Sequence, residues 1–163
     1  MSVFKSQFSR ALKVIPSDDA NIPTPFVVTS GTNTSTATNQ LISSSSSFQT
    51  TNVAVGDVVY NTTDSTAATV VSVTNATTIV LNADIFTATS KAFIIYQQSP
   101  QTGGGNSGCN LYIGGAGNAV VTTIGNDIVT FSGLLAGTVL PVQVFKVASS
   151  GSGTTATLII ALW

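Results

Sequence analysis

Histidine and glutamate are missing from this 163-residue chain, which has only one cysteine, one methionine and one tryptophan. Histidine is the usual proton carrier near neutral pH and the commonest metal ligand, so its absence excludes histidine-based acid–base and metal chemistry. The acidic groups are aspartates scattered along the sequence, whereas active sites concentrate titratable groups in one place. We therefore expect a protein that is not an enzyme, with no catalytic residue, no metal and no cofactor.

Charge of either sign is scarce, at 7% of residues against roughly 25% in an average soluble domain. Serine and threonine make up more than a quarter of the chain instead. A hydroxyl-rich, β-branched surface suits sheets that face other sheets, because desolvating charges is costly. A lone monomer with so few charges is poorly protected against association. We expect a subunit of an assembly; a monomeric, secreted, threonine-rich β domain is the alternative.

Long hydrophobic runs are also absent. No segment approaches the roughly 20 apolar residues that cross a bilayer, and the first ten residues lack the apolar core of a signal peptide. The single cysteine, Cys109, cannot form an internal disulfide, which fits folding in a reducing cytoplasm. A net charge of −1 without a basic stripe is atypical of nucleic-acid-binding proteins. We expect neither membrane nor nucleic acid among the partners.

Composition divides the chain into three regions. Residues 1–25 hold three of the five basic residues and three of the five prolines, which indicates an extended N-terminal arm. Residues 26–105 are predicted to form a β-barrel-like module that ends in a glycine-rich linker. Residues 106–163 are predicted to form a C-terminal β module.

Short strands are predicted throughout both modules, from runs of Val, Ile, Thr and aromatic residues broken by Gly and Asn. The low-complexity chain between residues 30 and 52 favours loops, with threonine-rich strands as the alternative. Any helix is confined to the first fifteen residues, where Phe4, Phe8 and Leu12 recur every four positions. The predicted fold class is all-β: two small antiparallel modules of the barrel or sandwich type with an extended N-terminal arm. Its strands are expected within residues 26–29, 53–60, 68–73, 77–81, 92–96, 111–113, 119–123, 127–131, 139–147 and 155–162.

Two motifs suggest more specific chemistry, and each has a plainer interpretation. The glycine clusters at 103–105 and 114–117 superficially resemble phosphate-binding loops, but no helical pattern follows either, so a hinge and a turn are favoured. Asp18 and Asp19 could begin a cation site with Asn21. Hard-cation sites need more oxygen ligands than these, so turn capping is favoured.

Aromatic residues in the middle region also allow two interpretations. They could form a carbohydrate-binding platform, or they could pack the core of the module, which we favour. Cys109 has no histidine partner, so a small buried residue is favoured over a catalytic thiolate. The aromatic residues concerned are Tyr60, Phe86, Phe93 and Tyr96.

Five short motifs follow one another in a fixed order. They are Pro16-Ser17-Asp18, Leu111-Tyr112-Ile113-Gly114, Val129-Thr130-Phe131, Ala136-Gly137 with Leu140-Pro141-Val142, and Gly153-Thr154-Thr155-Ala156 with Ile160-Ala161-Leu162. In order and spacing this series resembles virion structural proteins of tailed phages and gene transfer agents, among them head-spike base proteins. The resemblance covers residues 11–25 and 109–163. Compact members of that family lack the roughly 85 residues between these two parts, which we interpret as an inserted module.

The resemblance implies a phage virion structural protein on the capsid surface: a head decoration, cement or spike-base protein, assembled in the host cytoplasm. It would stabilise or extend the particle through contacts between identical copies. Its expected partners are copies of itself, as a trimer or pentamer on a capsid axis, and the major capsid protein or other virion proteins. The alternatives are a tail or fibre component that binds a receptor or glycans through the insert, and a β-rich enzyme such as a glycan hydrolase.

Interface residues are expected in two places. Basic and aromatic residues lie together on the proline-bounded N-terminal arm, which suits docking on a neighbouring subunit. The apolar last strand, ending in Trp163, suits a contact around a symmetry axis. The residues concerned are Phe4, Lys5, Phe8, Arg10 and Lys13 in the arm, with Phe145 and Trp163 in the C-terminal module.

Overall fold

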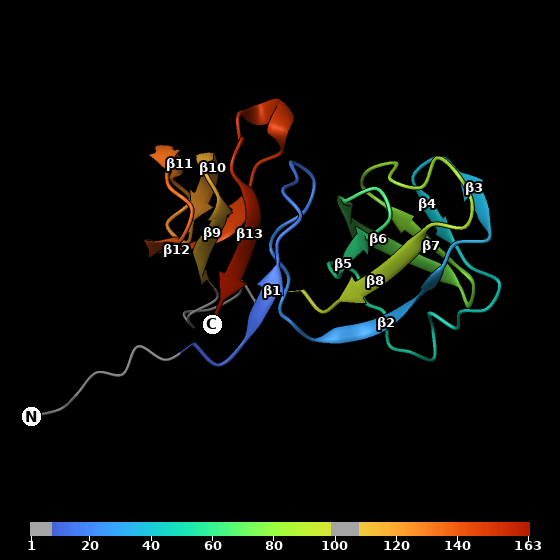
Figure 1. Ribbon diagram of the computed structural model, residues 1–163. Coiled ribbons are helices and arrows are strands. Elements are labelled where there is room, and N and C mark those ends of the chain that lie inside the picture. The colour runs from blue at the N-terminus through green and yellow to red at the C-terminus, as the bar shows by residue number, and fades with distance from the viewer. Residues whose placement is uncertain (1–7, 99–107) are drawn as a thin grey trace, which may run out of the picture.

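The computed structural model describes residues 8–98 and 108–163, and over these ranges the chain is all-β, as predicted. Two antiparallel sheets, of six and seven strands, stand side by side, and neither closes into a barrel (Figure 1). The one helical element in the described ranges is a 3-10 turn, η1 (Ser150–Ser152).

The six-stranded sheet takes its strands from both ends of the chain. Its order is β1-β13-β9-β12-β10-β11, so the first strand of the chain lies beside the last. Ala11 pairs with Leu162 and Lys13 with Ile160. The strands are β1 (Ala11–Lys13), β9 (Cys109–Gly115), β10 (Gly117–Thr123), β11 (Ile128–Leu134), β12 (Thr138–Val147) and β13 (Thr157–Leu162).

The seven-stranded sheet is built entirely from the chain between β1 and β9. Its order is β2-β8-β5-β6-β7-β4-β3. It contains two short strands, β3 and β4, inside the low-complexity region where loops were favoured. The strands are β2 (Val27–Thr32), β3 (Ser35–Ala37), β4 (Gln40–Ile42), β5 (Val58–Asn61), β6 (Thr66–Asn75), β7 (Thr78–Leu81) and β8 (Ala92–Tyr96).

Leu12 belongs to a strand, so the helical spacing of Phe4, Phe8 and Leu12 does not correspond to a helix at its described end. Phe4 lies outside the described residues. The strand forms because the backbone of this segment is bonded to the last strand: the Val14 N–H donates to Ile159 O at 2.9 Å and the Trp163 N–H to Arg10 O at 3.0 Å. Tertiary pairing thus overrides a local helical pattern only three repeats long.

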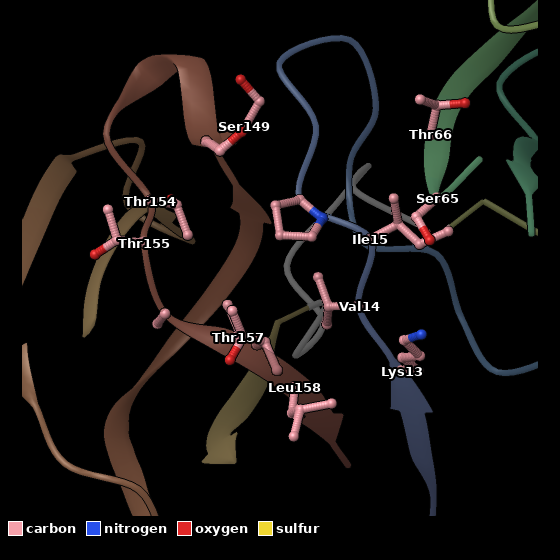
Figure 2. Close-up of a pocket in the computed structure, with 14 residues that line it drawn as sticks. Lys13, Val14, Ile15, Ser65, Thr66, Ser149, Thr154, Thr155, Thr157 and Leu158 are labelled. Carbon is pink, nitrogen blue, oxygen red and sulfur yellow. The ribbon is translucent and has the colours of Figure 1, made fainter. Parts of the chain in front are cut away.

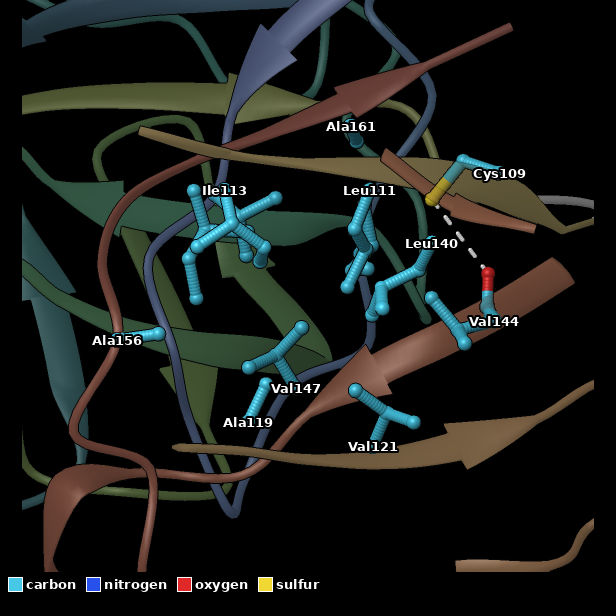
Figure 3. Close-up of a cluster of buried hydrophobic side chains, with 13 residues drawn as sticks. Cys109, Leu111, Ile113, Ala119, Val121, Leu140, Val144, Val147, Ala156 and Ala161 are labelled. Carbon is cyan, nitrogen blue, oxygen red and sulfur yellow. Dashed lines mark hydrogen bonds between the residues drawn. The ribbon is translucent and has the colours of Figure 1, made fainter. Parts of the chain in front are cut away.

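Each sheet has its own apolar core. In the six-stranded sheet the alternate residues of β9 point inward, so that Cys109, Leu111 and Ile113 are buried, and Ala119 and Val121 of β10 face them. Figure 3 shows these side chains meeting Leu140 and Val144 of β12 and others in one cluster. The seven-stranded sheet buries a second cluster, which includes Phe48, Phe86 and Phe93.

Candidate functional site

The segment between β1 and β2, residues 14–26, joins the two sheets and is bonded to both. On the side of the six-stranded sheet, the Ser17 N–H donates to Val147 O at 2.9 Å and the Ile22 N–H to Phe145 O at 2.7 Å. Val14 and Ile22 are part of the core of that sheet. We call residues 14–26 the junction segment. Figure 1 shows it between the two sheets.

The same segment also contacts the seven-stranded sheet. The Ser17 hydroxyl donates to Ala67 O at 3.0 Å, and Asp19 O accepts hydrogen bonds from Thr69 Oγ1 at 3.1 Å and Asn82 Nδ2 at 2.6 Å. A third apolar cluster is shared, because two of its members come from the junction segment and four from β5, β6 and β8. The cluster consists of Ile15, Ala20, Val58, Tyr60, Ala67 and Tyr96.

Asp18 attaches this turn to the loop that contains η1. Its carboxylate accepts hydrogen bonds from the Ser149 N–H at 3.1 Å, the Ser149 hydroxyl at 2.5 Å and the Ser152 hydroxyl at 2.9 Å. The hydroxyl of Ser149 contributes most to lowering the pKa of Asp18, followed by its N–H. The Lys146 ammonium donates to Asp18 O. The Asp18 carboxylate therefore bonds a distant loop, whereas the local cap of this turn is the Ser17 hydroxyl, which accepts a hydrogen bond from the Asp19 N–H at 3.1 Å.

No group of three or more His, Cys, Asp or Glu residues in the described ranges is placed to hold a metal ion. The Asp19 carbonyl accepts a hydrogen bond from the seven-stranded sheet, as described above, whereas the Asp18 carboxylate bonds the loop that contains η1. The two neighbouring aspartates therefore bond opposite sides of the junction.

A cavity of about 600 Å³ opens between the two sheets beside the junction segment. Figure 2 shows Ser65 and Thr66 of the insert on one side, and Thr157 of β13 with Thr154 and Thr155 of the loop before it on the other. Lys13, Val14 and Ile15 lie between them. The lining carries hydroxyls and one ammonium but no carboxylate, so it lacks an acid–base pair of the kind that glycoside hydrolysis uses.

The expected interface residues of the arm are only partly placed by the structure. Phe4 and Lys5 lie outside the described residues. Phe8 is exposed, and Lys13 is exposed in β1 where it lines the cavity. The Arg10 side chain makes a contact inside its own chain: its guanidinium carbon lies 3.9 Å from the centre of the Phe26 ring.

The two expected interface residues of the C-terminal module are half-buried within it. Phe145 lies in β12, and its carbonyl bonds the junction segment as described above. Trp163 packs against the core of the six-stranded sheet, and its backbone pairs with Arg10. The structure therefore brings Arg10 and Trp163 together. The last strand lies between β1 and β9 rather than at an edge.

Cys109 is buried, and its thiol donates to Val144 O at 3.4 Å (Figure 3). Burial raises its pKa to about 12, so the nucleophilic thiolate is not formed near neutral pH. This agrees with the interpretation of a small buried residue.

The aromatic residues of the insert do not form an exposed platform. Phe86 and Phe93 pack edge to face with ring centres 6.4 Å apart, and Tyr60 and Tyr96 with centres 5.2 Å apart. All four are buried. They therefore serve as core, which was the favoured interpretation. Of the two glycine clusters, residues 103–105 lie outside the described ranges, and residues 114–117 connect β9 to β10 without a helix.

Sequence reasoning missed an exposed apolar group around β11. Ile124 precedes the turn before this strand, Ile128 begins the strand, Leu135 follows it, and Val139 is the second residue of the next strand. β11 is an edge strand of the six-stranded sheet. The available signal was the charge pattern, because no charged residue lies between Asp127 and Lys146.

No helix in the described part of the chain is long and apolar enough to span a membrane. No known protein family, curated protein or solved structure matches this chain.

Proposed function

We propose that this protein is a non-enzymatic structural subunit of a tailed-phage-type particle, located on the capsid surface as a head decoration, cement or spike-base protein. It would be assembled in the host cytoplasm, and it would stabilise or extend the particle through contacts between its own copies.

One observation carries the proposal: the two parts of the chain that resemble virion proteins form one unit in space. They lie roughly 85 residues apart in the sequence, yet β1 pairs with β13 in a single sheet. The Pro16-Ser17-Asp18 turn packs on that sheet through the hydrogen bonds of Asp18 with Ser149 and Ser152. The remaining motifs lie on β9, β11, β12 and β13 or in the loops between them.

The strand pairing of the insert supports this interpretation. β2 to β8 pair only with one another, so the six-stranded sheet is complete without them. An extra module that leaves the parent sheet intact fits a family whose compact members have no insert. The charge-poor surface adds support, because a subunit covered by identical neighbours has little need of charged groups.

The hydrogen bonds of the described part of the arm guide the assignment of the partner contacts. From Ser9 onward the N-terminal segment is bonded to its own chain, so we assign the proposed contact with the major capsid protein to residues 1–8, which include Phe4, Lys5 and Phe8. We propose that copies of the chain meet as a trimer or pentamer around a capsid axis.

The test is the location of the protein on purified particles. Cryo-electron microscopy should show the wild-type chain at regular positions on the head. A variant that lacks residues 1–8 should keep its circular dichroism spectrum and melting temperature but lose occupancy. We expect a loss of about tenfold or more, because three side chains able to contact the capsid are removed together.

The outcomes of this experiment separate the possibilities. Density only at the tail would contradict the capsid location and favour a tail or fibre component. Unchanged occupancy of the shortened variant would contradict the arm contact alone. Absence of the wild-type chain from every particle would contradict the proposed function.

A further inference from the structure

We infer that the open edge of β11 is a self-association surface, where β11 of a second copy adds in antiparallel orientation about a twofold axis near Thr130. The inference rests on the proposed function only in that it supplies one of the contacts between copies. The contact itself is testable on the purified protein.

β11 is the least protected of the four edge strands in the described ranges. β1 and β3 have three residues each, and β2 begins beside Phe26, which the Arg10 guanidinium covers. β11 has seven residues without a charge or a proline. Natural sheets protect edge strands with charges, prolines, bulges or short lengths, because an open row of backbone N–H and C=O groups pairs with other strands. The irregularity of β11 lies near its end, between the pairs Ala119–Phe131 and Gly117–Leu134, and leaves residues 128–131 in regular pairing with β10.

The backbone of β11 presents unpaired groups in a regular row up to Ser132, after which the register with β10 shifts at Gly133, whose φ is 65°. The Thr123 N–H donates to Asp127 O at 2.9 Å, and the Gly133 N–H donates to Asn118 Oδ1 at 2.9 Å, so odd-numbered residues face β10. Because bonding direction alternates along a strand, the N–H and C=O groups of Ile128, Thr130 and Ser132 point to the open edge. These are the donors and acceptors that a second strand needs.

The side chains make this edge complementary to itself. Val129 and Phe131 point toward the core, opposite buried Val121 and Ala119, but they stay half-buried because the sheet ends there. An axis at Thr130 places Val129 of one copy opposite Phe131 of the other. The apolar core would then continue across the contact, and the Phe131 and Val129 side chains of both copies would become more deeply buried.

Electrostatics favours a second copy over a charged partner. A twofold contact sets each surface against itself, so a charge near the axis would meet the same charge of the other copy. Residues 128–145 carry no charge, and in the antiparallel pair the two Asp127 side chains lie at opposite ends. A charged partner would find no group to pair with on this edge. In Figure 1 β11 lies on the side of the sheet away from the insert, so the insert leaves it open.

Ile128→Lys tests the contact, with Val55→Lys as the matched control. Both replace an exposed apolar side chain, 77% and 61% exposed respectively, by the same charge. By light scattering coupled to size-exclusion chromatography, the wild type and Val55→Lys should dimerise. Ile128→Lys should weaken the dimer about tenfold or more, because each copy then places an ammonium opposite Ser132 of the other copy, where it must lose part of its hydration. A wild type that stays monomeric at about 1 mM, the concentration of a weak complex, would overturn the inference, as would an unweakened Ile128→Lys dimer.

Thr130→Cys tests the axis. A twofold at this residue brings the two introduced thiols together, so mild oxidation should give a covalent dimer, whereas Val55→Cys should stay uncrosslinked. Cys109 does not interfere, because it is buried. Absence of the crosslink in a dimerising Thr130→Cys protein would overturn the stated axis. A β11 dimer that never occupies a particle would contradict the proposed function and leave this contact standing.

Discussion

Tyr60 is a buried phenol with no hydrogen-bond partner in the described part of the chain. It lies in β5 within the cluster shared by the junction segment, with 3% of its surface exposed. Its hydroxyl lies near the Ile15 backbone without forming a good hydrogen bond. Burial raises its pKa, so the side chain stays neutral. An unsatisfied buried hydroxyl costs free energy that a purely apolar ring would not.

Tyr60→Phe should therefore stabilise the protein. The variant keeps the ring and its edge-to-face contact with Tyr96 but removes the orphan hydroxyl. We expect the free energy of unfolding in urea to rise by about 1 kcal/mol. Tyr112→Phe, at a half-buried position of β9, is the matched control and should change it by less than about 0.5 kcal/mol. Destabilisation by Tyr60→Phe would mean that the hydroxyl is satisfied in solution.

At the scale of single elements, the contact between β9 and β13 explains a glycine of the Leu-Tyr-Ile-Gly motif. Gly114 lies opposite Leu158, whose φ of 51° is unusual for a leucine. A Cβ at Gly114 would lie 2.8 Å from both Leu158 Cβ and Leu158 O. Because one of these atoms belongs to the backbone, the two strands would have to move apart to make room.

Gly114→Ala should thus lower the free energy of unfolding by about 1–3 kcal/mol, the usual cost of overpacking. Gly151→Ala in η1 provides the comparison, because the nearest atom to its Cβ would be the Ser149 hydroxyl at 3.5 Å. That control should change stability by less than about 0.5 kcal/mol. Equal effects of the two substitutions in thermal melts would show that the strands separate easily.

Strands with strong β-branched runs could be predicted from the sequence, and β8 was placed at its observed bounds, residues 92–96. β1, β3 and β4 have three residues each and exist through pairing, which no local pattern reports. In β12 strict alternation along the strand would put Leu140 and Val147 on opposite faces. Both are buried, because the register with β9 shifts between Leu140 and Val144 and the register with β10 shifts opposite Thr122 and Thr123.

The candidate site was less predictable than the strands, because it too depends on contacts between segments far apart in the sequence. Asp18 meets Ser149, a residue 131 positions later, and nothing in either local sequence indicates the pair. Arg10 belongs to a basic cluster that indicated an external partner, yet its stacking on Phe26 depends on where β2 begins. The open edge of β11 likewise follows from strand order, which the sequence alone did not supply.

At the scale of the whole molecule, the response to pH depends on aspartates, because the chain has no histidine or glutamate. Hydrogen bonds from Ser149 lower the pKa of Asp18. The pKa of Asp64 is lowered mainly by the hydrogen bond from Lys91. A carboxylate whose pKa is lower in the folded state stabilises the fold above its unfolded pKa, about 3.9 for aspartate. That stability is lost as the pH falls through the folded pKa.

The free energy of unfolding should thus stay nearly flat from about pH 8 to pH 5, where no side chain with an ordinary pKa titrates, and fall below about pH 4. Asp18→Asn should be less stable than the wild type at pH 7 and should lose less stability on acidification. Ser149→Ala, which removes the strongest donor to Asp18, should shift the curve in the same direction. Urea titrations at each pH measure the free energy of unfolding of the wild type, Asp18→Asn and Ser149→Ala. An acid limb of Asp18→Asn as steep as that of the wild type would contradict the assignment.

The pairing of the first strand with the last also sets the order of events during synthesis on the ribosome. β2 to β8 pair only among themselves, so the insert can fold once residue 96 has emerged. β1 must wait until β13, which ends at Leu162, has left the exit tunnel. A nascent chain stopped after residue 96 has emerged but before β13 is complete would display a finished insert beside an unpaired β1, so only chains that include β13 can present a complete six-stranded sheet to one another.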